Sequence, residues 1–205
     1  MEIETLFTEQ KWNILASLAD KKQSPLQLSK RLNTSMANIS QQLRLLEAFG
    51  LVKKEKIPNR DKGKPRTLFS LKKNYAYLIS ATGNYADKRL IELDSYHDIL
   101  LRIWFIKNSN LHYFVEKAFW KIEPYLDSMD IVAFKEETDK LGFVVVSKKG
   151  KELEKKLPDF FIKNIFGETK NFDVKILSQE QFKKSSSDYF VIYDPNSLAK
   201  KEVIT

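Results

Sequence analysis

The sequence contains no cysteine and only two histidines. The lack of cysteine excludes disulfides, thiolate zinc sites and a cysteine nucleophile, and it fits a reducing compartment. No apolar run approaches the roughly 18 residues that span a bilayer. The first residues include Glu2 and Glu4 and lack the charged-then-apolar pattern of a secretory signal. We therefore expect a soluble, cytoplasmic protein with no membrane partner.

Sequence patterns of catalysis are missing as well. The chain has no Gly-rich phosphate loop and no Gly-x-Ser-x-Gly elbow, and its two distant histidines have no nucleophile to serve. We expect neither an enzyme nor a bound cofactor.

Positive charge is concentrated at one end of the chain. Residues 1–80 contain 15 Lys and Arg against 7 Asp and Glu, whereas residues 81–205 contain 20 of each, so the net charge of +8 lies entirely in the first 80 residues. Between residues 53 and 73, nine basic side chains face only Glu55 and Asp61. Such a cluster favours a polyanionic partner, whereas charge that serves solubility is spread more evenly.

Three helices are expected in the first 50 residues, and each has a start signal. Thr8 caps the first, Ser24 the second, and Thr34 or Ser35 the third, which Gly50 ends in a left-handed turn. The apolar spacing predicts these buried faces: Trp12, Leu15, Ala16 and Ala19; Leu26, Leu28 and Leu32; Ile39, Leu43, Leu46 and Phe49. Three helices in so short a span are typical of a helix-turn-helix.

The outward face of the third helix carries short polar and amide side chains. Asn and Gln pair with adenine through two hydrogen bonds, and Arg does so with guanine. The residues expected to contact DNA are Ser35, Asn38, Gln41, Gln42 and Arg44. The alternative is that this is only the solvated face of an amphipathic helix.

A basic hairpin is expected directly after this helix. Leu51 and Val52 begin a strand, residues 58–65 form a turn-rich loop, and residues 67–71 return as a second strand. The side chains expected to contact phosphates are Arg60, Lys62, Lys64 and Arg66. An exposed basic loop can also be no more than a solvated loop.

The run SMANISQQLRLLEAFGLVKKEK, residues 35–56, resembles the recognition helix and first wing strand of the ArsR-type winged-helix regulators, including archaeal ones. The matching residues are Ser40, Gln41, Gln42, Leu43, Leu46, Gly50, Leu51 and Val52. The resemblance covers roughly residues 6–80. It implies a transcriptional regulator that binds double-stranded DNA as a homodimer.

The metal sites of that family are not expected here. Metal-sensing members carry a cysteine pair in the helix before the recognition helix, and residues 25–32 contain none. A second family site uses Asp, His and His or Glu. The candidates for it are Asp94, His97, His112 and Glu116, but their spacing departs from the family pattern. We expect ordinary packing at both histidines, and no metal.

Residues 85–126 are expected to form a helical linker that dimerises. Two helices are predicted, with these apolar positions: Leu90, Leu93, His97, Leu100, Leu101 and Trp104; Leu111, Phe114, Val115, Ala118, Phe119, Ile122 and Leu126. A twofold dimer through these helices would present two recognition helices to DNA half-sites. The alternative is that both helices pack on the C-terminal domain of the same chain.

Residues 127–205 are expected to form a small α/β domain. Strands are predicted at 131–134, 142–147, 172–177 and 189–193, with helices at 151–166, interrupted by Pro158, and at 179–183. The order of elements resembles small nucleotidyltransferase-like domains. That resemblance implies a Gly-Ser turn for the triphosphate and paired carboxylates for magnesium.

The transferase positions have changed in this chain. Lys135, Lys140 and Gly142 stand where the resemblance implies phosphate- and metal-binding groups, and Asp139 and Asp173 are the remaining acids. We expect a catalytically inactive domain that receives a small-molecule or protein effector.

Together these features predict an α+β protein of three parts: a winged helix-turn-helix (1–84), a helical dimerisation linker (85–126) and a nucleotidyltransferase-like α/β domain (127–205). The predicted function is sequence-specific transcription regulation as a homodimer, with the recognition helix in the major groove and the wing on phosphates. Two alternatives stay open: a nucleotidyltransferase-like enzyme guided by a winged helix, and an RNA-binding or antitoxin-type adaptor.

Overall fold

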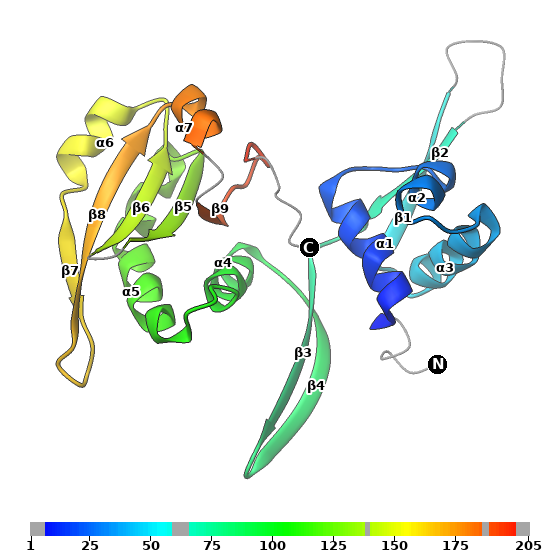
Figure 1. The fold of residues 1–205 in the computed structure, drawn as a ribbon, viewed down its shortest axis with the longest axis horizontal. Helices are drawn as coiled ribbons and strands as arrows, with labels where there is room; N and C mark the ends of the chain where they lie inside the picture. Colours follow the sequence, from blue (N-terminus) through cyan, green and yellow to red (C-terminus); the bar gives the residue numbers. More distant parts are fainter. Residues whose placement is uncertain (1–6, 59–65, 138–139, 186–188, 200–205) are drawn as a thin grey trace. The chain divides into compact units, whose positions relative to one another are not determined.

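A computed structural model describes residues 7–58, 66–137, 140–185 and 189–199. The chain divides into two compact units, 1–94 and 95–205, and each is described by itself (Figure 1). The predicted α+β class is confirmed: a helical N-terminal region with a strand hairpin is followed by a unit built on a sheet.

The N-terminal unit begins with three helices: α1 (Glu9–Asp20), α2 (Pro25–Arg31) and α3 (Met36–Ala48). Ser24 and Gln27 form a reciprocal capping box at α2, and the Ser35 hydroxyl accepts the Asn38 N–H at α3. Thr8 precedes α1 without a capping bond from its side chain. Gly50 has φ +73°, the left-handed conformation that follows α3. The predicted roles of Ser24, Ser35 and Gly50 are confirmed, whereas the predicted side-chain cap at Thr8 is wrong.

The predicted buried face of α1 is wrong at Trp12, Ala16 and Ala19, and the predicted face of α2 is wrong only at Leu26, since Leu32 packs against the core beside Leu28. In α1 the core takes Ile14 and Leu18, while Trp12 is 57% exposed. In α2, Leu28 is fully buried and Leu26 is exposed. Both helices carry apolar residues on more than one side, and only one row at spacing i, i+4 of each helix enters the core. In α3 the predicted Ile39, Leu43 and Leu46 are all fully buried, and Phe49 packs at the edge of the same core.

The predicted wing is present. Strands β1 (Val52–Ile57) and β2 (Arg66–Leu71) pair antiparallel, with Val52 opposite Leu71 and Ile57 opposite Arg66. Gln23 forms a one-residue antiparallel bridge beside β2, because its backbone exchanges two hydrogen bonds with Phe69. The base of the hairpin therefore packs in the same hydrophobic core as the three helices.

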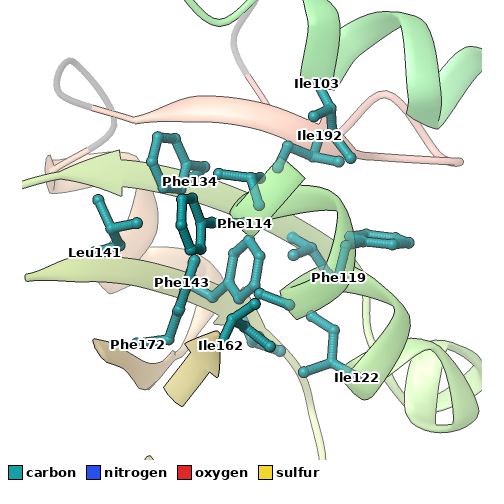
Figure 2. Close-up of a cluster of buried hydrophobic side chains, with 14 of the residues drawn as sticks. Ile103, Phe114, Phe119, Ile122, Phe134, Leu141, Phe143, Ile162, Phe172 and Ile192 are labelled. Atoms are coloured by element: carbon teal, nitrogen blue, oxygen red, sulfur yellow. The ribbon is translucent and has the colours of Figure 1, made fainter. Parts of the chain in front are cut away.

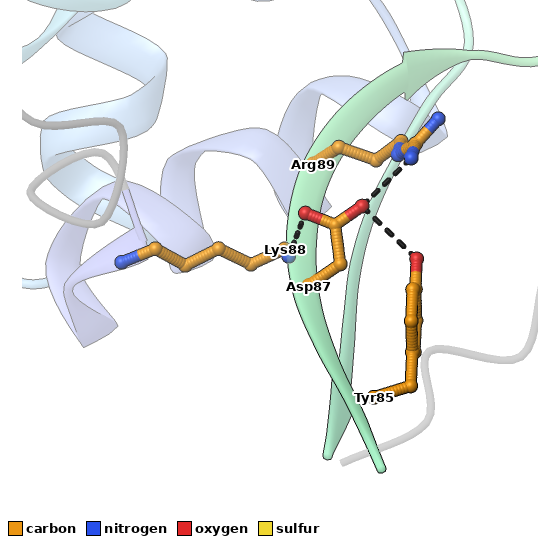
Figure 3. A network of polar contacts seen from close by, with 4 residues as sticks. All are labelled: Tyr85, Asp87, Lys88 and Arg89. Carbon is orange, nitrogen blue, oxygen red and sulfur yellow. Dashed lines mark hydrogen bonds and ion pairs between the residues drawn. The ribbon is translucent and has the colours of Figure 1, made fainter. Parts of the chain in front are cut away.

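A second hairpin occupies residues 75–92, of which 75–84 were predicted to belong to the winged helix and 85–92 to the helical linker. Strands β3 (Tyr75–Thr82) and β4 (Tyr85–Glu92) pair along their full length around the turn at Gly83. Alternation in β4 places Tyr85, Asp87 and Arg89 on one face (Figure 3), where Asp87 accepts hydrogen bonds from Tyr85 at 3.1 Å and from Arg89 at 2.7 Å. These contacts, the one from Arg89 first, lower the pKa of Asp87. Because it lies in β4, Leu90 is a strand residue and not a helical one.

The C-terminal unit is a five-stranded sheet with strand order β7-β8-β6-β5-β9. Its strands are β5 (Ile131–Glu136), β6 (Leu141–Val146), β7 (Phe160–Lys163), β8 (Thr169–Leu177) and β9 (Phe190–Tyr193). Its α-helices are α4 (Ser95–Trp104), α5 (His112–Ile122), α6 (Gly150–Lys156) and α7 (Gln179–Ser185), with 3-10 turns at Ser109–Leu111 and Glu123–Ser128. Only the β6–β8 pair is parallel; the other pairs run antiparallel.

Both faces of this sheet are apolar and covered. Phe134, Phe143 and Phe172 pack with Phe114 and Phe119 of α5 in one cluster (Figure 2). On the opposite face, Ala133, Val144 and Val146 form a second cluster with Phe182 of α7. The two clusters give the unit its own core on either side of the central strands.

The predicted dimerisation linker at 85–126 is corrected by this packing. Residues 85–92 form β4 in the N-terminal unit, whereas α4 and α5 belong to the C-terminal unit. The α5 positions Phe114, Val115 and Phe119 are buried against the sheet of the same chain. An apolar stripe on a helix does not specify which surface it packs against. Here it packs against the apolar sheet face that contains Phe143, which would otherwise be exposed to water.

The predicted helix at 151–166 is also wrong in its second half. Helix α6 stops at Lys156, and residues 160–163 form the edge strand β7, with Phe160 opposite Phe172. Proline at 158 cannot donate a helical hydrogen bond and disfavours helix at the residue before it. The Asp159 carboxylate accepts the Val174 N–H at 3.2 Å and holds the chain at the start of β7.

Candidate nucleic-acid interface

Helix α3 is anchored by its buried row and presents the opposite row to solvent. Ile39, Leu43 and Leu46 are fully buried, whereas Gln41 and Arg44 are exposed. Gln41 and Arg44 are three positions apart and therefore lie on one side of the helix. Neither side chain makes a hydrogen bond or ion pair with another residue among those that the structure describes. Both are free to bind an external partner.

The other predicted base-contacting residues already have partners within the helix. The Asn38 amide donates to Thr34 Oγ1 at 3.1 Å and accepts from the Gln42 amide at 3.3 Å. Ser35 caps the helix. Asn38 and Gln42 are half-buried, and Gln42 Oε1 has no hydrogen-bond partner among the described residues. The structure therefore divides the predicted set into two free side chains and three with a role in the helix itself.

Met36 is a candidate contact that the sequence analysis missed. It is the first residue of α3 and is 55% exposed, next to exposed Ala37. Apolar side chains at this end of a recognition helix can contact the methyl group of thymine. Its place directly after the Ser35 cap was the signal that could have identified it.

The wing strands carry basic side chains outward. Lys54 pairs with Glu47 at 3.0 Å and Lys22 with Glu55 at 2.6 Å; the hydrogen bond from Lys22 is the main cause that lowers the pKa of Glu55. Arg66 is exposed at the start of β2 and makes no ion pair with a described residue. The predicted Arg60, Lys62 and Lys64 lie outside the described residues.

An ion pair between Lys140 and Asp173 occupies the positions where the nucleotidyltransferase resemblance implies phosphate- and metal-binding groups. Gly142 on β6 lies opposite Asp173 on the parallel strand β8, and Lys140 Nζ is 2.8 Å from Asp173 Oδ2. That hydrogen bond raises the pKa of Lys140. A side chain at position 142 would place its Cβ 3.1 Å from Asp173 Oδ1, so the position has little room for a second carboxylate. Asp139 lies outside the described residues.

Two of the four candidate ligands for a family-type metal site, His97 and His112, have other contacts. A ring nitrogen of His112 lies 2.8 Å from the Ile106 carbonyl oxygen, and His97 packs edge-on against Tyr96. Within the described ranges, no group of three His, Cys, Asp or Glu side chains is arranged to hold a metal ion.

Comparison with known families agrees with this geometry. Residues 8–54 match the family model described as bacterial regulatory protein, arsR family. The matched segment contains α1, α2, α3 and the first residues of β1, and it supports a DNA-binding transcriptional regulator. The arsR-like segment does not extend to the β3–β4 hairpin or to the C-terminal unit. No curated protein matches the chain. In the described part of the chain, no helix has the length and apolar character needed to cross a bilayer.

Proposed function

We propose that the protein is a sequence-specific transcription regulator of the cytoplasm that binds DNA as a homodimer. The observation that carries this proposal is the arsR-like helix-turn-helix, whose third helix presents unpaired Gln41 and Arg44 beside a basic hairpin. In the proposed complex α3 lies in the major groove and the wing contacts the flanking phosphates. Ser35, Asn38 and Gln42 support the helix and line its edge.

Replacing Gln41 or Arg44 by Ala is expected to weaken binding to the cognate site by about 1–3 kcal/mol and to relax preference at particular base pairs, because each side chain can form two hydrogen bonds to one base. Selection from a random duplex library, followed by titration of the selected site, measures both effects. The matched control for Arg44 is Lys155→Ala, which removes one exposed positive charge from α6. Unchanged base preference in both recognition-helix variants would show that α3 does not read sequence.

The α5 half of the predicted dimer surface is buried against the sheet of the same chain, whereas Trp104 of the predicted α4 stripe is 60% exposed. In the N-terminal unit the exposed apolar side chains include Trp12 on α1 and Ile79 on β3, which is 70% exposed. A two-stranded hairpin is at best marginally stable alone. The base of the β3–β4 hairpin is supported by Phe7 stacking on Tyr77 and by the bond from Tyr75 to the Gly50 carbonyl, whereas its far half is exposed. We propose that a second copy covers that half.

Sedimentation of the parent protein is expected to give about twice the 24.0 kDa chain mass. Ile79→Lys is expected to shift the protein toward the monomer, because it would bury a charge in the interface. Ile165→Lys is the matched control, since Ile165 is 84% exposed in the C-terminal unit. A parent that sediments as a monomer at micromolar concentration contradicts the proposal.

The C-terminal unit is proposed to be an inactive nucleotidyltransferase-like domain that receives an effector. Its antiparallel β5–β6 pair beside parallel β8 is compatible with the predicted layout. The Lys140–Asp173 pair stands where that layout would need two metal-binding acids, and a fixed cation repels magnesium.

A further inference from the structure

A pocket in the C-terminal unit lies at one end of the sheet. The parallel strands β6 and β8 both end there, with Val146 opposite Leu177, and the chain continues into α6 and α7 respectively (Figure 1). A pocket of about 630 Å³ opens between the two connections. This volume lies within the range of small-molecule sites. It is at the opposite end of β6 from Lys140 and Asp173, so it is distinct from the transferase-like position.

The two connections leave toward opposite faces of the sheet. Leu153 of α6 packs in the cluster that contains Phe143 and α5, whereas Phe182 of α7 packs in the cluster on the other face. Such a divergence at the carboxyl ends of parallel strands creates a crevice, which is the usual ligand position in open α/β sheets. The pocket therefore follows from the topology of the unit rather than from a loose surface loop.

The walls of the pocket are held by hydrogen bonds. Ser147 is buried; its hydroxyl donates to the Ser128 carbonyl at 2.5 Å and accepts the Lys149 N–H at 2.9 Å. On the other side Ser178 and Gln181 form a reciprocal capping pair, in which the Ser178 N–H donates to Gln181 Oε1 at 2.8 Å. These bonds fix the backbone of both connections before any ligand arrives.

The charge of the pocket is positive. Lys148, Lys149 and Lys151 line it, are exposed, and make no ion pair or side-chain hydrogen bond with another described residue. Of the two acids in the lining, Glu152 is bound by Lys156 at 2.7 Å. That hydrogen bond is the main cause that lowers the pKa of Glu152, and the charge of Lys149 in the lining lowers it further. Glu154 is then the single lining acid that such an external lysine does not neutralise in the described structure.

We propose that this pocket binds a small organic phosphate, with Lys148, Lys149 and Lys151 as the cations that hold its phosphate groups. Lysine binds phosphate as a mobile point charge. The position between α6 and α7 brings three lysines to one opening, which suits a compact polyphosphate or nucleotide. The inference rests on the effector role proposed above and names the chemistry of the effector.

Isothermal titration of the full chain with tripolyphosphate and with ATP tests the proposal. The parent is expected to bind at least one of them with a dissociation constant below about 1 mM. The double variant Lys148→Glu, Lys149→Glu is expected to raise that constant at least tenfold, because it replaces two cations of the site by acids. The matched control, Lys155→Glu with Lys163→Glu, makes the same charge change at exposed residues outside the pocket and is expected to leave the constant within about twofold.

Three results would overturn the proposal. They are a dissociation constant above about 1 mM for both probes, equal weakening by the pocket and control variants, and loss of DNA binding by the Lys148→Glu, Lys149→Glu variant when no phosphate compound is present, which would make these lysines a DNA contact. The DNA titration is independent of the probe titration. A protein that binds phosphate in the pocket but no DNA would contradict the proposed regulator and leave the pocket assignment standing.

Discussion

Replacing Lys62, Lys64 and Arg66 together by Ala is expected to weaken binding to every duplex by a similar factor. The three side chains are proposed to contact phosphates, which carry no sequence information. Each lost contact releases about one counterion fewer, so the slope of log K against log salt concentration should fall by roughly 2–3 units. Fluorescence anisotropy at several salt concentrations, with cognate and scrambled duplexes, measures the slope and the loss in affinity.

The matched control for the wing variant is the triple replacement of Lys155, Lys163 and Lys183 by Ala. These are three exposed cations of the C-terminal unit, so the net charge changes equally. The control is expected to keep the parent slope. If the wing variant binds DNA as tightly as the parent in low salt, the basic hairpin is a solvated loop and not a wing on DNA.

Replacing Phe143 by Ala is expected to destabilise the C-terminal unit by about 3–5 kcal/mol. Phe143 is fully buried on β6, between the rings of Phe134 at 6.3 Å and Phe172 at 5.5 Å between centroids. The substitution removes the apolar contacts and leaves a cavity in the centre of the cluster shown in Figure 2. Chemical unfolding followed by circular dichroism and tryptophan fluorescence gives the change in free energy of unfolding.

The same experiment tests the division into two units. The core of residues 7–94 shares no residue with the cluster around Phe143, so its unfolding transition is expected to stay at the parent denaturant concentration. Phe161→Ala on β7 is the control, because that ring is 62% exposed and its loss should change stability by about 0.5 kcal/mol or less. A Phe143→Ala protein with parent stability, or one whose two units unfold together at a lower midpoint, contradicts this description.

The features that the sequence determined by itself are the local ones. Ser24 and Ser35 start helices because their hydroxyls satisfy backbone N–H groups a few residues away, and Gly50 ends α3 because it accepts a positive φ. Residues that are neighbours in the sequence likewise determine the basic hairpin, the strands with alternating apolar and polar residues, and the positive charge of the first 80 residues. This is why the helix-turn-helix and its nucleic-acid partner could be predicted without coordinates.

Only the tertiary structure decided which of several apolar rows is buried. Trp12 and Ile14 are similar in hydrophobic character, yet one faces solvent and the other the core, because α1 meets its neighbours on one side only. The same holds for α5, whose stripe covers a sheet of its own chain instead of a second copy. The hydrophobic effect is non-directional. An apolar stripe therefore predicts that a helix face will be buried, but it does not predict which surface will bury it.

The candidate sites show the same limit for polar groups. Asn38, Gln41 and Gln42 look equivalent in the sequence, and only the geometry of α3 pairs Asn38 with Gln42 and leaves Gln41 free. The Lys140–Asp173 pair joins residues 33 positions apart through the parallel register of β6 and β8. Hydrogen bonds and ion pairs act over a few ångströms, so residues distant in sequence interact only after the strands and helices have packed.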